Sequence, residues 1–191
     1  CKGQKTWPQN LYDCKIAVQY LRANAEKLSV DPNNIGVIGG SAGGHLAAMV
    51  GVTGDMQKLQ PQKPYKSIST RVQAAVDLYG VNDFTALQNL GDECVSQFLG
   101  ATYNQNPDLW KLASPITHAT PDDPPFMILH GTADKTVHLS QSKQLHEKLK
   151  AAGVDSTLEI IEGAPHTFHL QPKQKDLRPL VIGFFDKHLK N

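Results

Sequence analysis

Short apolar runs alternate with amphipathic stretches along most of the chain. The runs with the length and composition of a buried strand are residues 35–38, 72–79, 126–129 and 157–161. Segments with helical periodicity follow three of them, at residues 45–52, 139–152 and 177–189. Strands that are apolar throughout and alternate with helices predict a mostly parallel sheet with helices on both faces, which is the α/β fold class.

A helix is also predicted before the first strand. Its apolar positions are spaced by 3 or 4 residues, at Leu11, Cys14, Val18, Leu21, Ala25 and Leu28. Pro8 fits the start of this helix, and Asp31-Pro32 ends it, because the residue before a proline avoids the helical conformation. The spacing therefore predicts one continuous helix with a single apolar face.

Residues 82–121 interrupt the alternation. This segment is more polar and irregular, with short helical pieces around residues 84–90, 93–99 and 107–112. We expect residues 1–191 to form a single domain in which this segment is a short cap-like insertion. Trp110 and Phe84 are candidate walls of a pocket, with core packing as the alternative.

Composition narrows the partners that the chain could bind. The 19 Lys and Arg residues nearly balance the 18 Asp and Glu residues, for a net charge of +1, so no basic surplus points to nucleic acid. The longest apolar stretches are too short to span a membrane. Three cysteines without CxxC spacing argue against a zinc site or a disulfide framework and favour free or buried thiols. We therefore expect no nucleic acid, no membrane, no metal and no cofactor. The chain does not open with Met, which leaves the compartment unknown.

A nucleophile elbow is predicted between the first strand and the helix that follows it. Residues 39–43 read Gly-Gly-Ser-Ala-Gly, which fits the pattern G-x-S-x-G with Ser41 at its centre. The tight turn requires small neighbouring residues. It also places the N-terminus of the following helix where it can stabilise the oxyanion of a reaction intermediate, with the Ala42 N–H as the first expected donor. A phosphate-binding turn is the alternative, but the Lys-Ser/Thr ending of a P-loop is missing. His45 is expected to pack or hydrogen-bond beneath the elbow.

Other loops at the same sheet edge supply a base and an acid, which a serine nucleophile requires. His166 lies on a loop rich in Gly and Pro after the last strand and is the predicted base, with His169 as its rival. Asp134 follows the third strand and is the predicted acid, with Asp83 as the alternative. The chain order of serine, acid and histidine is the one that this kind of sheet requires.

These motifs together resemble the esterase/lipase branch of the α/β hydrolases. The similar segments are residues 13–22, 31–36, 39–47, 114–116, 124–134 and 163–168. The nearest branch is that of bacterial acetylxylan and feruloyl esterases. The resemblance implies an α/β-hydrolase fold and a serine esterase that removes acetyl or feruloyl groups from plant polysaccharide or oligosaccharide through an acyl-enzyme. It slightly favours a secreted or periplasmic location.

The chain differs from that family in its N-terminal part. Family members carry further N-terminal strands and an HGGG-type loop that supplies a second oxyanion donor, whereas the only His-Gly here is His130-Gly131. The resemblance thus implies an N-terminally incomplete fold whose first strand exposes an apolar edge. A longer polypeptide, a second chain or a dimer is expected to complete the sheet. Two other functions stay open: a prolyl-oligopeptidase-type serine peptidase domain, and an incomplete, non-catalytic binding module.

Overall fold

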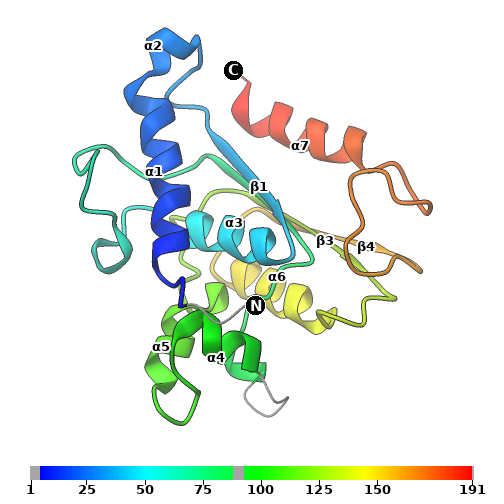
Figure 1. Ribbon diagram of the computed structural model, residues 1–191. Helices are drawn as coiled ribbons and strands as arrows, with labels where there is room; N and C mark the ends of the chain where they lie inside the picture. The colour runs from blue at the N-terminus through cyan, green and yellow to red at the C-terminus, as the bar shows by residue number, and fades with distance from the viewer. Residues whose placement is uncertain (1–4, 88–92, 191) are drawn as a thin grey trace.

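A four-stranded parallel sheet forms the centre of the structure, a computed structural model that describes residues 5–87 and 93–190 (Figure 1). Its strands are β1 (Gly36–Gly40), β2 (Ala74–Leu78), β3 (Phe126–Gly131) and β4 (Ser156–Ile161). They lie side by side in chain order, and every neighbouring pair is parallel. The predicted parallel sheet is confirmed, with each strand boundary within two residues of its expected position.

Helices cover both faces of the sheet, as predicted. On one face lie α3 (Ala42–Val52) and α6 (Ser140–Ala151), and on the other lies α7 (Arg178–Leu189) (Figure 1). Side chains alternate between these two layers, since Phe126 packs with the α3 and α6 layer whereas Met127 packs with α7. Every residue of β2 and β3 is buried. The carboxyl ends of the parallel strands therefore meet at one edge of a sheet whose two central strands are fully buried.

The N-terminal helix is interrupted, which corrects the prediction of one continuous helix. It consists of α1 (Gln9–Ala23) and a single turn, α2 (Ala25–Leu28), with Asn24 between them. The side-chain amide of Asn24 donates to the carbonyl of Tyr20, in competition with the regular helical bonding. No residue of α2 is buried, so no packing opposes the break.

The buried face of α1 carries polar side chains that the apolar repeat did not reveal. Lys15 is fully buried, and its ammonium donates to the carbonyl oxygens of Thr53, Gly54 and Leu59 at 2.9–3.0 Å. These acceptors lie at the end of α3 and in the following loop, which contains η1 (Gln57–Leu59). Burial lowers the pKa of Lys15 to about 8, against the opposing charge of Asp55. Lys15 thus links α1 to the loop after α3 through three hydrogen bonds.

Short helical segments lie within the described part of residues 82–121, which is drawn in green in Figure 1. They are η2 (Thr85–Leu87), α4 (Glu93–Leu99), α5 (Pro107–Leu112) and η3 (Pro115–Thr117). The last part of the helical piece expected at residues 84–90 lies outside the described residues. Phe84 and Trp110 are 5 % and 1 % exposed and belong to the hydrophobic core, which agrees with the core-packing alternative. That this segment caps the site stays a prediction.

The cysteines differ from the expectation of free or buried thiols. Cys94 is disulfide-bonded, whereas Cys14 is free and half-buried. An odd number of cysteines cannot reveal which of them form a bond, because pairing depends on distance in the fold. In the part of the chain that the structure describes, every helix is too short or too polar to cross a membrane.

The first turn of α3 lies against the ends of β1 and β2, and two glycines allow this approach. A Cβ atom on Gly39 would lie 2.1 Å from the carbonyl oxygen of Gly43. One on Gly44 would lie 2.3 Å from Oδ1 of Asp77, whereas one on Gly43 would meet nothing within 4 Å. Gly44 therefore leaves the space that this approach requires, whereas Gly43 faces open space.

We expect the variant Gly44→Ala to lower the free energy of unfolding by about 1–3 kcal/mol, because the added methyl group has no room. The matched variant Gly43→Ala should leave stability unchanged or raise it by up to about 1 kcal/mol, since alanine favours helix. Urea unfolding followed by circular dichroism measures both values. Equal destabilisation by the two substitutions would contradict the packing described for α3.

Candidate active site

Ser41 occupies a strained turn between β1 and α3. Its φ of 55° and ψ of −119° lie outside the regions that a residue with a side chain normally adopts. The turn is held by a hydrogen bond of 2.9 Å from the Ser41 N–H to the carbonyl of Leu78 at the end of β2. Among the four described non-glycine residues with positive φ, three lie at this sheet edge: Ser41, Tyr79 and Thr167. Such clustering is typical of functional sites.

The structure brings the three predicted triad residues into one hydrogen-bonded row. Oγ of Ser41 lies 2.9 Å from Nε2 of His166, and Nδ1 of His166 lies 2.6 Å from Oδ2 of Asp134. The side chain of Asp134 is fully buried, and that of His166 is 13 % exposed. With Nδ1 donating to the carboxylate, Nε2 is left as the acceptor for the serine proton. This is the arrangement that activates a serine, and the catalytic role of each residue remains a prediction.

Asp134 is held as an anion by donors on both of its oxygens. The backbone N–H groups of Thr136 and Val137 donate to Oδ1 at 2.8 and 2.9 Å. Burial raises the pKa of Asp134, but the hydrogen bonds from His166, Val137 and Thr136 outweigh it, so the pKa lies below its usual value. The carboxylate therefore stays charged and in a fixed orientation at neutral pH.

Backbone hydrogen bonds join the acid loop to the histidine loop. The N–H of Thr132 donates to the carbonyl of Ile161, and the N–H of Ala133 donates to the carbonyl of Ala164. In the reverse direction, the N–H of Gly163 donates to Oγ1 of Thr132 at 2.8 Å. Asp134 and His166 thus sit on two loops that are cross-linked immediately before each functional side chain.

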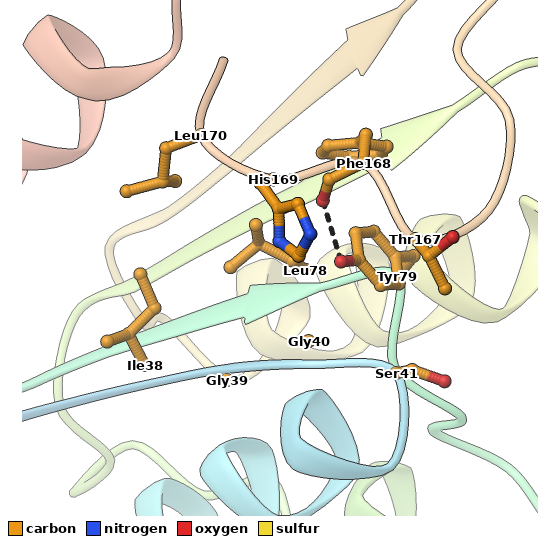
Figure 2. A pocket seen from close by; sticks show the side chains of 10 residues that line it. All are labelled: Ile38, Gly39, Gly40, Ser41, Leu78, Tyr79, Thr167, Phe168, His169 and Leu170. Carbon is orange, nitrogen blue, oxygen red and sulfur yellow. Dashed lines mark hydrogen bonds between the residues drawn. The ribbon is translucent and has the colours of Figure 1, made fainter. Parts of the chain in front are cut away.

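The ring of Tyr79 packs against that of His166, a contact that the sequence did not predict. Its ring meets the imidazole of His166 edge to face, with 4.9 Å between the ring centres. Figure 2 shows its hydroxyl directed at the carbonyl of Phe168, to which it donates at 2.7 Å. The available signal was a tyrosine at the carboxyl end of the predicted strand 72–79, the end of the sheet where the site was expected.

The rival residues lie elsewhere. His169 is exposed and lines a cavity, and Nε2 of His166, not His169, faces Ser41. Asp83 takes part in a local turn, because its Oδ1 accepts from the hydroxyl and N–H of Thr85.

His45 is buried beneath the elbow, as expected, and donates through Nε2 to the carbonyl of Ala113 at 2.7 Å. Burial lowers the pKa of His45 to about 4, although that carbonyl opposes the shift.

Ala42, the predicted oxyanion donor, is the first residue of α3 and is exposed beside Ser41. The first N–H groups of a helix have no acceptor within the helix, so this N–H is available to an oxygen bound at the turn. It also lies at the positive end of the helix dipole, which favours a developing negative charge. Its catalytic use is a prediction.

An open, mainly apolar cavity of about 440 Å³ borders Ser41. Its walls come from the end of β1, the end of β2 and the histidine loop: Ile38, Gly39, Gly40, Ser41, Leu78, Tyr79, Thr167, Phe168, His169 and Leu170 (Figure 2). Within the described residues β1 pairs only with β2, and Ile38 is 44 % exposed. The cavity therefore lies beside an apolar edge of the sheet that has one free side.

Comparisons with known proteins give one matching family pattern and several similar esterases. The sequence pattern of the BD-FAE family matches residues 1–149. Esterase LipQ of Mycobacterium tuberculosis is 38 % identical over 172 residues, which cover 86 % of this chain and 40 % of LipQ. This chain thus spans well under half the length of that relative.

Solved structures show the same similarity. A truncated carbohydrate esterase from gut microbiota superposes with a TM-score of 0.86 at 29 % identity, over 97 % of this chain and 70 % of that one. An acetyl ester-xyloside bifunctional hydrolase from Caldicellulosiruptor lactoaceticus superposes with a TM-score of 0.83 at 29 % identity, over 97 % of this chain and 68 % of that one. The α/β-hydrolase fold predicted from the motifs is thereby confirmed.

A buried acid beneath the elbow makes stability depend on pH. Asp77 is fully buried and accepts from the Gly80 N–H and the Asn82 amide, both at 2.8 Å. Burial raises its pKa to about 6 despite these bonds. Because this native pKa is above the unfolded one, the stability that Asp77 contributes is full below about pH 4 and is lost as the pH rises through 6.

We therefore expect the variant Asp77→Asn, which cannot ionise, to gain stability relative to the wild type as the pH rises. The difference between their free energies of unfolding should change by up to about 3 kcal/mol between about pH 4 and pH 7. Urea unfolding at a series of pH values measures this difference. Two parallel stability curves would show that Asp77 does not have a raised pKa.

Proposed function

The chain belongs to the BD-FAE family of the α/β-hydrolase superfamily, and from this premise we propose that it hydrolyses carboxylic esters with Ser41 as the nucleophile. The observation that carries the proposal is the continuous row from Ser41 through His166 to Asp134, with contacts of 2.9 and 2.6 Å. The names of its relatives, esterase and carbohydrate esterase, support the same class of reaction.

In the proposed reaction, Nε2 of His166 takes the proton of Ser41 as Oγ attacks the ester carbonyl. The tetrahedral oxyanion accepts a hydrogen bond from the Ala42 N–H. His166 then gives its proton to the leaving alcohol, and an acyl group stays on Ser41. A water molecule, deprotonated by His166, attacks this acyl-enzyme and releases the acid, which restores the Ser41 hydroxyl. Asp134 keeps the imidazole in the tautomer that these steps need.

A second oxyanion donor completes the proposal. A segment outside the matched motifs, in this polypeptide or in another chain, is proposed to pair with the free side of β1 and to supply that donor next to Ser41. Exposed Ile38 and the cavity beside β1 support such a neighbour. Losing one donor of an oxyanion hole typically lowers the rate about 10²- to 10³-fold, so activity is to be measured on the full-length protein.

For the substrate, we propose acetyl or feruloyl esters of plant polysaccharide or oligosaccharide. The support is the similarity to a carbohydrate esterase and to an acetyl ester-xyloside hydrolase. Both relatives are named for carbohydrate substrates, and the near balance of charges in this chain suits a neutral ligand.

A fluorophosphonate probe tests the nucleophile. We expect it to label Ser41, and the variant Ser41→Ala to lose labelling and to lower kcat by about 10⁵- to 10⁶-fold. Ser140→Ala is the matched control, because Oγ of Ser140 also lies 2.9 Å from an imidazole nitrogen, that of His138, on the exposed surface. This control should keep full activity. A wild-type protein that neither reacts with the probe nor cleaves any ester would favour the non-catalytic binding module.

A substrate panel tests the specificity. We expect kcat/KM for acetylated or feruloylated xylo-oligosaccharides to exceed that for peptides by at least about tenfold, which corresponds to about 1.4 kcal/mol in the transition state. p-Nitrophenyl acetate serves as the reference ester, since its leaving group needs no sugar recognition. Faster cleavage of peptides would support the serine-peptidase alternative, which has the same chain order of serine, acid and histidine.

A further inference from the structure

A second histidine lies behind Asp134, in a place that the proposed reaction does not use. His130 belongs to β3, and its side chain is fully buried. Its Nε2 lies 2.9 Å from the carbonyl oxygen of Val137 and 3.3 Å from Oδ2 of Asp134. A carbonyl and an ionised carboxylate can only accept, so Nε2 of His130 carries the hydrogen.

The other ring nitrogen has a partner of its own. Nδ1 of His130 lies 2.7 Å from Oγ of Ser142, a fully buried residue of α6. Burial lowers the pKa of His130 more than the Val137 carbonyl and the charge of Asp134 raise it, so the ring is neutral. In a neutral ring with hydrogen on Nε2, Nδ1 must accept, and the hydroxyl of Ser142 therefore donates.

We propose that His130 and Ser142 are positioning residues that hold Oδ2 of Asp134 in line with His166. The proposal rests on the proposed function, because it concerns the same triad. The Ser142 hydroxyl donates to Nδ1 of His130. The Nε2–H of His130 donates to the Val137 carbonyl, and Nε2 also lies 3.3 Å from Oδ2 of Asp134. Nδ1 of His166 donates to the same oxygen at 2.6 Å.

The geometry distinguishes this role from ordinary core packing. Val137 is used twice, since its N–H donates to Oδ1 of Asp134 while its carbonyl accepts from His130. The carboxylate thereby has backbone donors on Oδ1 and nitrogens of two imidazoles, those of His166 and His130, near Oδ2. A core position needs no imidazole for packing, and burying one costs free energy unless both nitrogens are bonded. Both are bonded here, and one of them faces the acid.

The proposal predicts a loss in kcat without a matching change in KM. The variant His130→Phe removes Nε2–H, which frees Asp134 to rotate and weakens its alignment with His166. We expect kcat to fall about 10- to 100-fold, as displacement of a catalytic group typically does. KM should stay nearly constant, because His130 lies behind the triad and away from the bound ester.

Three variants of the full-length protein test this. His130→Gln can place an amide N–H where Nε2 was and should recover most of the kcat that His130→Phe loses. Ser142→Ala removes only the hydroxyl and should cause a smaller loss. The proton between His166 and Asp134 gives a downfield NMR resonance, which we expect to shift or broaden in His130→Phe and in Ser142→Ala. His146→Phe is the matched control, because Nδ1 of His146 also lies 2.9 Å from a serine, Ser156, away from the triad.

Unchanged kcat and an unchanged downfield resonance in folded His130→Phe would overturn the proposal, as would an equal loss of kcat in His146→Phe. If His130→Phe does not fold, Ser142→Ala decides by the same two measurements. Failure of the proposed function is a separate result, namely a wild type that cleaves no ester and does not react with the fluorophosphonate probe. The NMR measurement needs no turnover, so it decides on His130 in that case as well.

Discussion

The close approach of α3 to the ends of β1 and β2 determines where every other part of the site must lie. Ser41 can project from the sheet only because Gly39 and Gly44 leave room for backbone that passes within van der Waals distance. The strained φ of Ser41 persists because the hydrogen bond to Leu78 and the packing of α3 compensate for it. Once this turn is set, the Ser41 hydroxyl lies within hydrogen-bond distance of His166 on the histidine loop, beside the first residue of α3.

Buried polar groups at this edge are held by fixed donors and acceptors instead of water. Asp77, Asp134, His45 and His130 are all removed from solvent, and each has partners at hydrogen-bond distance. In a poorly solvated site such bonds are stronger, and they require no reorganisation when charge moves during a reaction. Burial raises the pKa of Asp77. The pKa of Asp134 lies below its usual value, because the hydrogen bonds that this carboxylate receives outweigh the effect of burial.

Much of this could be predicted from the sequence, since strand positions and site loops both follow from local patterns. The apolar runs fixed the four strands within two residues, and chain order selected Ser41, Asp134 and His166, which the structure brings together. What could not be predicted depends on contacts between distant residues. The sequence suggests that Lys15 is a surface residue. In the structure its ammonium is bound by three carbonyls of residues 53–59, a contact that no local pattern indicates. The disulfide bond of Cys94 is of the same kind. The break at Asn24 instead comes from a local contact, the bond from its side-chain amide to the Tyr20 carbonyl.

Long-range contacts also determine the tautomer of His130, and through it the environment of Asp134. Sequence reasoning treated His130 only as half of a His-Gly pair, because nothing local reveals that Ser142 and Val137 lie on opposite sides of its ring. Those two contacts decide which nitrogen carries the hydrogen, and hence whether the ring supports or opposes the charge on Asp134. A histidine with the hydrogen on Nδ1 would present a lone pair to the carboxylate and repel it. Positioning of the triad therefore depends on residues of β3 and α6 that no substrate touches, and substitutions there can alter the reaction while leaving all three triad residues in place.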